Sequence, residues 1–214
     1  MKYDVIIVGA GPGGIYSAYE LMKKCSDKKI AVFDSGYSLK KRHCPIDGEK
    51  VKACIKCKSC SIMSGFGGAG AFSDGKYNIT NDFGGTLYEY IGKKAATELM
   101  QYVDDINMAH GGEGTKMYST AGTNLKKVCL QNRLKLLNAS VRHLGTDINL
   151  VVLGRLYDEL KEHVDFYFES PVSHIECLEN GGYRVWSNDK SYDCEKCIVS
   201  VGRSGSKWMS KVCE

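Results

Sequence analysis

Residues 2–14 read Lys2-Tyr3-Asp4-Val5-Ile6-Ile7-Val8-Gly9-Ala10-Gly11-Pro12-Gly13-Gly14, and this stretch decides the fold. Its apolar run stops at a glycine, which is typical of a buried parallel strand. The glycines follow the pattern G-x-G-x-x-G, and residues 13–24 carry apolar side chains at helical spacing. A second apolar run over 29–34 ends on Asp34, about 20 residues after the last glycine. The sequence therefore predicts a βαβ unit that binds a dinucleotide.

Each fingerprint position has a physical role. Gly9 permits a tight turn, Gly11 lets the backbone approach a pyrophosphate, and Gly14 lets helix and strand pack closely. The helix N-terminus offers free N–H groups to phosphates. Asp34 can accept hydrogen bonds from ribose hydroxyls and would repel the ribose phosphate of NADP, but the fingerprint alone does not separate FAD from NAD. The predicted cofactor-binding residues of this unit are Gly9, Gly11, Pro12, Gly13, Gly14, Asp34 and Ser35.

The C-terminal third contains further strand signals. Residues 165–169 predict a third parallel strand, and residues 197–201 predict a buried strand that ends at a glycine. Between them, 172–178 and 183–187 flank Asn180-Gly181-Gly182, which indicates a hairpin. Most of these strands extend the nucleotide-binding sheet.

The middle of the chain has a different pattern. A long helix is expected over 86–110, a short helix capped by Asn124, a strand over 135–143, and a helix over 148–163 with Asp147 as its cap. This mixture indicates an inserted α+β segment.

Composition sets the broad class. The chain has 214 residues, 43% of them hydrophobic, and a formal charge of +4, which is ordinary for a globular protein. No apolar run approaches the length of a bilayer span, so no membrane partner and a cytoplasmic location are expected. Residues 40–58 hold six Lys and one Arg against Asp47 and Glu49, which makes this segment +5. No aromatic residue interrupts it, so nucleic-acid binding by base stacking is not expected.

Four of the ten cysteines, Cys44, Cys54, Cys57 and Cys60, fall within this region or just after it. Two successive C-x-x-C steps and a fourth cysteine predict a metal site, either a [4Fe–4S] cluster or a structural zinc. Two alternatives remain open: a reduced loop without a ligand, and a redox-active dithiol of Cys54 with Cys57 or Cys60. The separate Cys194-x-x-Cys197 pair is expected to be structural.

Four motifs resemble one known family. They are residues 65–76 (Gly65-Phe66-Gly67-Gly68-Ala69-Gly70-Ala71-Phe72-Ser73-Asp74-Gly75-Lys76), residues 42–45 leading into the cysteine steps, residues 143–147, and residues 198–204. Together they are similar to the signatures of uncharacterised bacterial and archaeal FAD-dependent dehydrogenases of the glutathione-reductase-like flavoprotein superfamily.

The resemblance implies an α/β fold. A Rossmann-like FAD-binding domain would cover 1–75 and 145–214, with the substrate-domain insertion over 76–144. It also implies that the glycine-rich residues run beside the flavin ring, where only a backbone poor in side chains fits. The cofactor-binding residues that it adds are Arg42, Gly67, Gly68, Ala69, Gly70, Ser73, Asp74, Gly202 and Arg203.

The function that the resemblance implies is an FAD-dependent oxidoreductase of a small-molecule substrate, with hydride transfer at flavin N5. His143 is the candidate proton donor, against the commoner case of an ordinary histidine. Arg142 and Arg203 are candidates to meet an anionic substrate or the flavin phosphates, against the commoner case of ordinary surface arginines. NAD(P)H or an acidic electron carrier would supply electrons. Members of that family are longer, so the second hypothesis is a truncated, non-catalytic FAD- or metal-binding fragment that needs a C-terminal partner chain.

Overall fold

The structure, a computed structural model, describes residues 1–179 and 181–214. The chain forms two compact units: unit 1 comprises 1–71 and 156–214, and unit 2 comprises 72–155. The sequence predicted the corresponding boundaries at 75/76 and 144/145.

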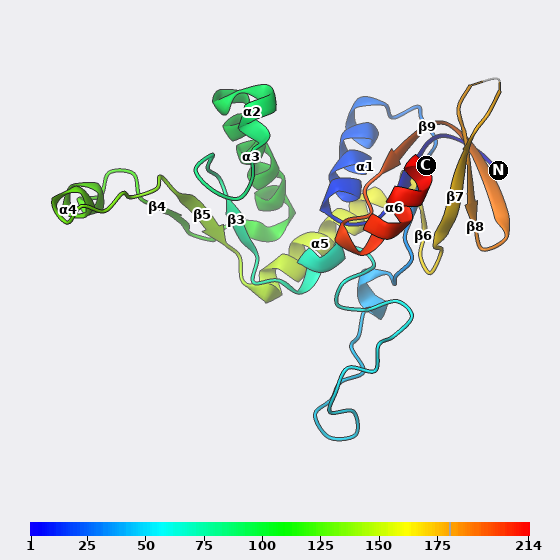
Figure 1. The fold of residues 1–214 in the computed structure, drawn as a ribbon, viewed down its shortest axis with the longest axis horizontal. Helices are drawn as coiled ribbons and strands as arrows, with labels where there is room; N and C mark the ends of the chain where they lie inside the picture. Colours follow the sequence, from blue (N-terminus) through cyan, green and yellow to red (C-terminus); the bar gives the residue numbers. More distant parts are fainter. Residues whose placement is uncertain (180) are drawn as a thin grey trace. The chain divides into compact units, whose positions relative to one another are not determined.

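Unit 1 is built on a six-stranded sheet in the order β6-β2-β1-β9-β8-β7 (Figure 1). Its strands are β1 (Lys2–Val8), β2 (Ile30–Phe33), β6 (Val164–Tyr167), β7 (Val172–Cys177), β8 (Tyr183–Ser187) and β9 (Lys190–Val199). β1 pairs in parallel with β2 and β9, and β2 pairs in parallel with β6. β8 pairs antiparallel with both β7 and β9. The predicted α/β fold with a parallel sheet is confirmed.

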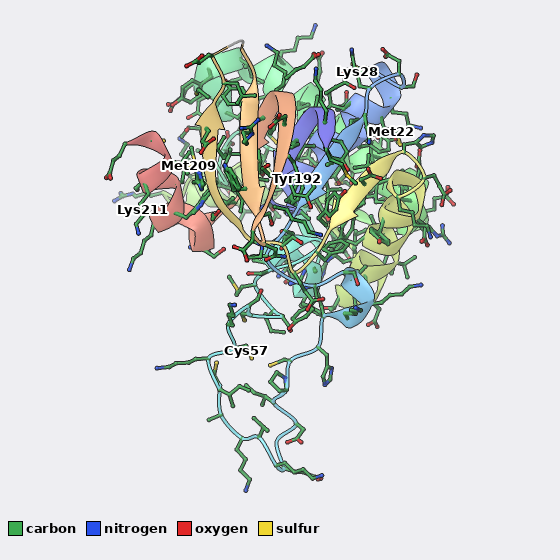
Figure 2. All side chains as sticks on the ribbon, turned by 90° about the vertical axis from the view of Figure 1, so that its right-hand side faces the viewer. Met22, Lys28, Cys57, Tyr192, Met209 and Lys211 are labelled. Atoms are coloured by element: carbon green, nitrogen blue, oxygen red, sulfur yellow. The ribbon has the colours of Figure 1, made fainter. Side chains whose placement is uncertain are left out.

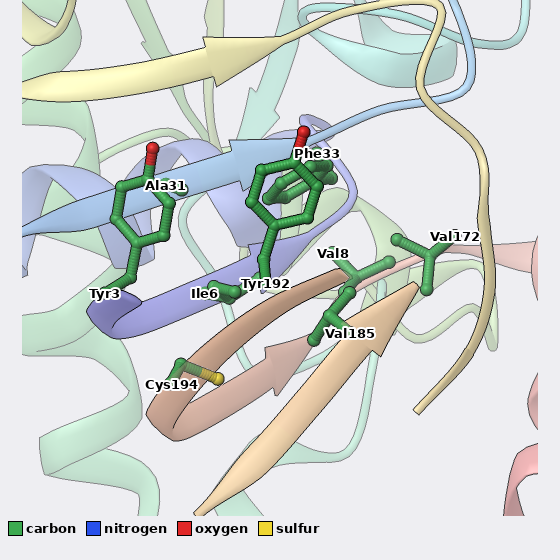
Figure 3. Close-up of a cluster of buried hydrophobic side chains, with 9 residues drawn as sticks. All are labelled: Tyr3, Ile6, Val8, Ala31, Phe33, Val172, Val185, Tyr192 and Cys194. Atoms are coloured by element: carbon green, nitrogen blue, oxygen red, sulfur yellow. The ribbon is translucent and has the colours of Figure 1, made fainter. Parts of the chain in front are cut away.

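Helix α1 (Pro12–Lys24) covers the parallel strands with an apolar stripe that includes Ile15, Ala18 and Met22. A cluster of nine buried residues, drawn in Figure 3, lies over the sheet. Its members come from β1, β2, β8, β9 and the first residue of β7: Tyr3, Ile6, Val8, Ala31, Phe33, Val172, Val185, Tyr192 and Cys194. The apolar runs that predicted the strands therefore form the core.

The C-terminal strands differ from the prediction in length. The strand expected over 197–201 begins at Lys190, because Tyr192 and Cys194 are buried and pair with β8. The predicted hairpin joins β7 to β8, and its expected turn includes Asn180, which lies outside the described residues. Helix α6 (Ser206–Cys213) ends the chain, and its Trp208 Nε1 donates to the Ser173 carbonyl oxygen at 2.9 Å.

Unit 2 contains a three-stranded antiparallel sheet in the order β3-β5-β4. Its elements are β3 (Lys76–Asn78), α2 (Leu87–Ile91), α3 (Lys93–Asn107), a π-helical turn over Met108–Gly112, β4 (Met117–Ser119), α4 (Leu125–Gln131), β5 (Ser140–His143) and most of α5 (Thr146–Leu160). Among the described residues, no helix combines the length and apolar character that crossing a bilayer requires.

Several boundaries in unit 2 were predicted wrongly. The single helix over 86–110 is broken at Gly92, whose φ of 80° lies in the left-handed region. Asn124 has helical dihedral angles and makes no side-chain capping bond to α4. The strand expected over 135–143 is reduced to β5, and Asp147 lies inside the first turn of α5 rather than at its cap.

Candidate functional site

A cavity of about 930 Å³ opens in unit 1 where β1, β2 and β9 end. We call it the carboxyl-edge cavity, because ligands of open parallel sheets bind beyond the carboxyl ends of the strands. Its size is within the usual range for ligand sites. The predicted residues that line it are Gly9, Gly11, Pro12, Gly13, Asp34, Ser35, Gly68, Ala69, Gly70, Gly202 and Arg203.

Two of the fingerprint glycines are required by packing. Gly9 has a φ of 106°, and a Cβ there would collide with the Ser200 carbonyl group. A Cβ on Gly14 would collide with the Gly9 carbonyl oxygen. These two positions hold the turn between β1 and α1 tightly against the end of β9, whatever the cavity binds.

Gly11 is different. It is the residue before α1, with an extended backbone (φ −74°, ψ −178°) that any residue can adopt. A Cβ on Gly11 would meet no atom outside its chain neighbours closer than the Gly68 Cα, at 3.9 Å. The first turn of α1 has no side-chain cap and no acidic residue. Pro12 has no N–H, and the Ile15 N–H donates to the Gly11 carbonyl oxygen at 2.9 Å, so Gly13 and Gly14 carry the N–H groups that this helix start offers to an anion. The protein's own packing leaves room at Gly11, beside these N–H groups.

The glycine-rich loop, residues 65–76, packs against the turn between β1 and α1. The Gly67 N–H donates to the Ala10 carbonyl oxygen at 2.8 Å. Phe66 is fully buried, with its ring 5.0 Å from that of Tyr157 and 5.7 Å from that of Phe166. The aromatic anchor fixes the loop, so the structure brings together two motifs that lie far apart in the sequence.

Arg42 has a structural position rather than one in the cavity lining. Its guanidinium donates to the carbonyl oxygens of Ser61 (2.8 Å), Ile62 (2.7 Å) and Phe66 (2.6 Å), and the residue is only 5% exposed. Burial lowers the pKa of Arg42, and the neighbouring Asp34 partly offsets that effect. Arg42 therefore clamps the segment that precedes the glycine loop.

Asp34 also supports the backbone. Its Oδ2 accepts from the Ala10 N–H and its Oδ1 from the Gly36 N–H, both at 2.7 Å. The carboxylate thus joins the fingerprint turn to the turn after β2. Each oxygen keeps a further lone pair for a ribose hydroxyl.

Two more of the predicted cofactor-binding residues, Ser73 and Asp74, fall in unit 2, as does His143. The Gly145 N–H donates to the Asp74 carbonyl oxygen at 3.0 Å, so the ends of two signature motifs are adjacent. The Asp74 carboxylate lies 2.6 Å from the Lys76 ammonium; this hydrogen bond, with a smaller effect of His143, lowers the pKa of Asp74. His143 is exposed on β5.

Arg142 belongs to the interior of unit 2. Its guanidinium donates to both carboxylate oxygens of Asp104, at 2.7 and 2.8 Å, and to the Thr115 carbonyl oxygen at 2.6 Å. Asp104 is buried, so this bidentate pair links α3 to β5. This pairing accounts for Arg142 without a substrate, so the anionic-substrate alternative has no support in its contacts.

The cysteine-rich segment does not assemble a metal site. Cys44 is half-buried, whereas Cys54, Cys57 and Cys60 are exposed, and all four are free thiols. Within 1–179 and 181–214, no three His, Cys, Asp or Glu side chains are grouped closely enough to hold a metal ion. Figure 2 shows Cys57 on an extended loop beyond the sheet. Cys57 and Cys60 instead line the carboxyl-edge cavity, whereas Cys44 and Cys54 do not.

The second cysteine pair lies in β9. Cys194 is buried, and a hydrogen bond between the two thiols raises the pKa of Cys197 and lowers that of Cys194. Burial of Cys197 reinforces the upward shift of its pKa. Both thiols are part of the packing of β9, as a structural pair would be.

Several parts of the cavity wall were not predicted from the sequence, among them residues 170–172 and Trp208. Ser200 and Val201 line it directly after β9, and a signal for them existed: they follow a buried strand that pairs in parallel with β1. The segment 57–60 and Met63 also line it, and no sequence pattern indicated that this basic, irregular loop returns to the sheet.

Solved structures share this fold. Glycine oxidase from Geobacillus kaustophilus matches with a TM-score of 0.56 at 14% identity, over 99% of this chain and 58% of that one. The dithionite-reduced L-α-glycerophosphate oxidase from Mycoplasma pneumoniae, with FAD bound, matches with a TM-score of 0.55 at 16% identity, over 99% and 57%. The chain therefore shares its Rossmann-like α/β fold with these two oxidases.

Sequence comparison adds one relative. An uncharacterised protein of Clostridium beijerinckii is 24% identical over 206 residues, which is 95% of this chain and 32% of that protein. The chain thus spans about a third of that relative and a little over half of the two oxidases. No protein-family model matches the sequence.

Proposed function

We propose that this chain binds FAD in the carboxyl-edge cavity and serves as the cofactor-binding part of an FAD-dependent oxidoreductase. The observation that carries the proposal is the room at Gly11, at the uncapped N-terminus of α1, inside a fold that the two oxidases share. The motifs over 65–76 and 198–204, which resemble the signatures of FAD-dependent dehydrogenases, support the same cofactor.

The chain's own residues would hold the cofactor in three ways. The N–H groups of Gly13 and Gly14, in the first turn of α1, would bind the pyrophosphate. Asp34 would accept hydrogen bonds from the adenosine ribose while it keeps the turn in place. The anchored loop at 68–70 would present backbone without bulky side chains to the flavin.

When bound, FAD exchanges a hydride with a substrate at flavin N5. His143, an exposed imidazole beside the Asp74–Lys76 pair, would hold or release a proton for that exchange. No three of the described His, Cys, Asp or Glu side chains are grouped closely enough to hold a metal ion, so the cofactor that we propose is the flavin without a metal cluster.

The test is a visible spectrum of the anaerobically purified protein after FAD has been added and excess removed, with metal analysis of the same sample. A flavin spectrum near one equivalent that bleaches with dithionite is the expected result. A colourless protein after reconstitution would overturn the proposal for this chain and favour the alternative of a fragment that needs a second chain.

A further inference from the structure

The carboxyl-edge cavity has an uneven charge. Lys58 and Arg203 are its cationic lining residues, and Asp34 is its anionic one. Both oxygens of Asp34 already accept backbone N–H bonds. Lys58 is exposed and pairs with no carboxylate in the described part of the chain. The lining therefore holds a lysine without a carboxylate partner, in the same cavity as the fingerprint turn.

The backbone that carries Lys58 is fixed just beyond it. The Cys60 carbonyl oxygen accepts from the N–H groups of Met63 (3.0 Å) and Ser64 (2.8 Å), which closes a tight turn. The Arg42 guanidinium binds the same turn through the carbonyl oxygens of Ser61 and Ile62. Lys58 therefore extends from an anchored base rather than from the middle of a free loop.

Two lysines of the basic segment, residues 40–58, differ in whether they line the cavity. Lys56 and Lys58 are both exposed and are two residues apart, but only Lys58 lines the cavity. In the same way Cys57 and Cys60 line it, whereas Cys54 is equally exposed and does not.

We infer that Lys58 is a cofactor-binding residue, whose ammonium pairs with the pyrophosphate of the nucleotide held in the carboxyl-edge cavity. The inference rests on the proposed function, because it needs a nucleotide in this cavity. Lysine binds phosphate as a mobile point charge, so a flexible side chain on a fixed turn suits the role. The segment 57–60, all four residues of which line the cavity, then forms a second wall of the nucleotide site.

The test compares Lys58→Gln with Lys56→Gln, which removes the same charge two residues away. ADP and adenosine are the probes, and calorimetry measures their affinities. Lys58→Gln should weaken ADP binding about tenfold, as expected for the loss of a hydrogen bond between charged groups. Adenosine has no phosphate, so its affinity should be unchanged in both variants, and Lys56→Gln should bind ADP nearly as the parent does.

Thiol protection gives a second readout. Saturating ADP should slow alkylation of Cys57 and Cys60 by N-ethylmaleimide and leave Cys54 unaffected, as measured by peptide mass spectrometry.

The outcomes separate the two hypotheses. A parent protein that binds neither ADP nor FAD refutes the proposed function, and the role of Lys58 with it. A parent that binds ADP, with equal losses in the two lysine variants or equal losses for ADP and adenosine, overturns the role of Lys58 alone. Unprotected Cys57 and Cys60 would overturn the second wall.

Discussion

The substitution Gly11→Ala separates ligand binding from folding. The added Cβ would have its nearest neighbour, the Gly68 Cα, at 3.9 Å, which is ordinary van der Waals contact, and the backbone angles suit alanine. Loss of chain flexibility in the unfolded state favours alanine by about 0.4–1 kcal/mol, and poorer capping of α1 opposes this by a similar amount. We expect the free energy of unfolding to change by less than about 1 kcal/mol.

Nucleotide binding should respond much more strongly. The methyl group would occupy the room that the pyrophosphate needs and would push it away from the N–H groups of α1. Losing one hydrogen bond to a charged group costs about 1.5–3 kcal/mol, which corresponds to roughly a 10- to 150-fold loss of affinity. Calorimetric titration with FAD and with ADP measures this loss, and thermal unfolding without ligand measures stability.

Gly14→Ala is the matched control, because its Cβ would collide with the Gly9 carbonyl oxygen. It should destabilise the empty protein by about 1–3 kcal/mol or more. Unchanged affinity of Gly11→Ala for both nucleotides would refute the reasoning, because the room at Gly11 would then have no part in binding. A Gly11→Ala protein that unfolds as readily as Gly14→Ala would show that packing, not the ligand, requires this glycine.

Three further predictions test other parts of the structure. Asp104→Ala leaves Arg142 buried without its partner and should destabilise the protein by about 3–5 kcal/mol in thermal or urea unfolding; a change below 1 kcal/mol would contradict the buried pair. Arg42→Met removes a buried cation together with its donors to three carbonyl oxygens, so trypsin or thermolysin should cut the segment 43–64 faster while the rest of unit 1 stays protected. Cys197 should resist iodoacetamide at pH 8 while Cys57 reacts, because the raised pKa of Cys197 keeps its thiol protonated; equal labelling of the two thiols would contradict the assignment.

Much of the fold could be predicted because its determinants are local. These determinants follow one another in the sequence: the apolar run that ends at Val8, the turn at Gly9 and the apolar stripe on α1. Each of them indicates one local structure. The break at Gly92 could not be predicted in the same way. A glycine inside a helical pattern costs only about 1 kcal/mol, so the apolar periodicity continued through it, and the choice between one helix and two depends on tertiary packing.

The residues of the candidate site also differ in how far the sequence could predict their roles. Gly9, Gly14 and Asp34 could be assigned because steric necessity and hydrogen bonding act within one βαβ unit. Arg42 could not, because its acceptors are main-chain carbonyl groups 19 to 24 residues further along the chain, and a carbonyl group carries no residue-type signal. The cysteine spacing predicted a metal site, but spacing describes only how close ligands can come, and no three of the described His, Cys, Asp or Glu side chains are grouped closely enough to hold a metal ion.

The basic segment shows why composition alone does not identify a site. By charge, Arg42, Lys56 and Lys58 are equivalent members of one segment with a net charge of +5. The structure gives them different surroundings: Arg42 is buried against carbonyl oxygens, Lys58 lines the cavity, and Lys56 is exposed and does not line it. A charge that is already surrounded by acceptors stabilises the fold, whereas a charge without a partner in a cavity wall is free to bind a ligand. Comparing the ADP affinities of the Lys56→Gln and Lys58→Gln variants therefore tests whether this loop is only solvated surface or forms one wall of a nucleotide site.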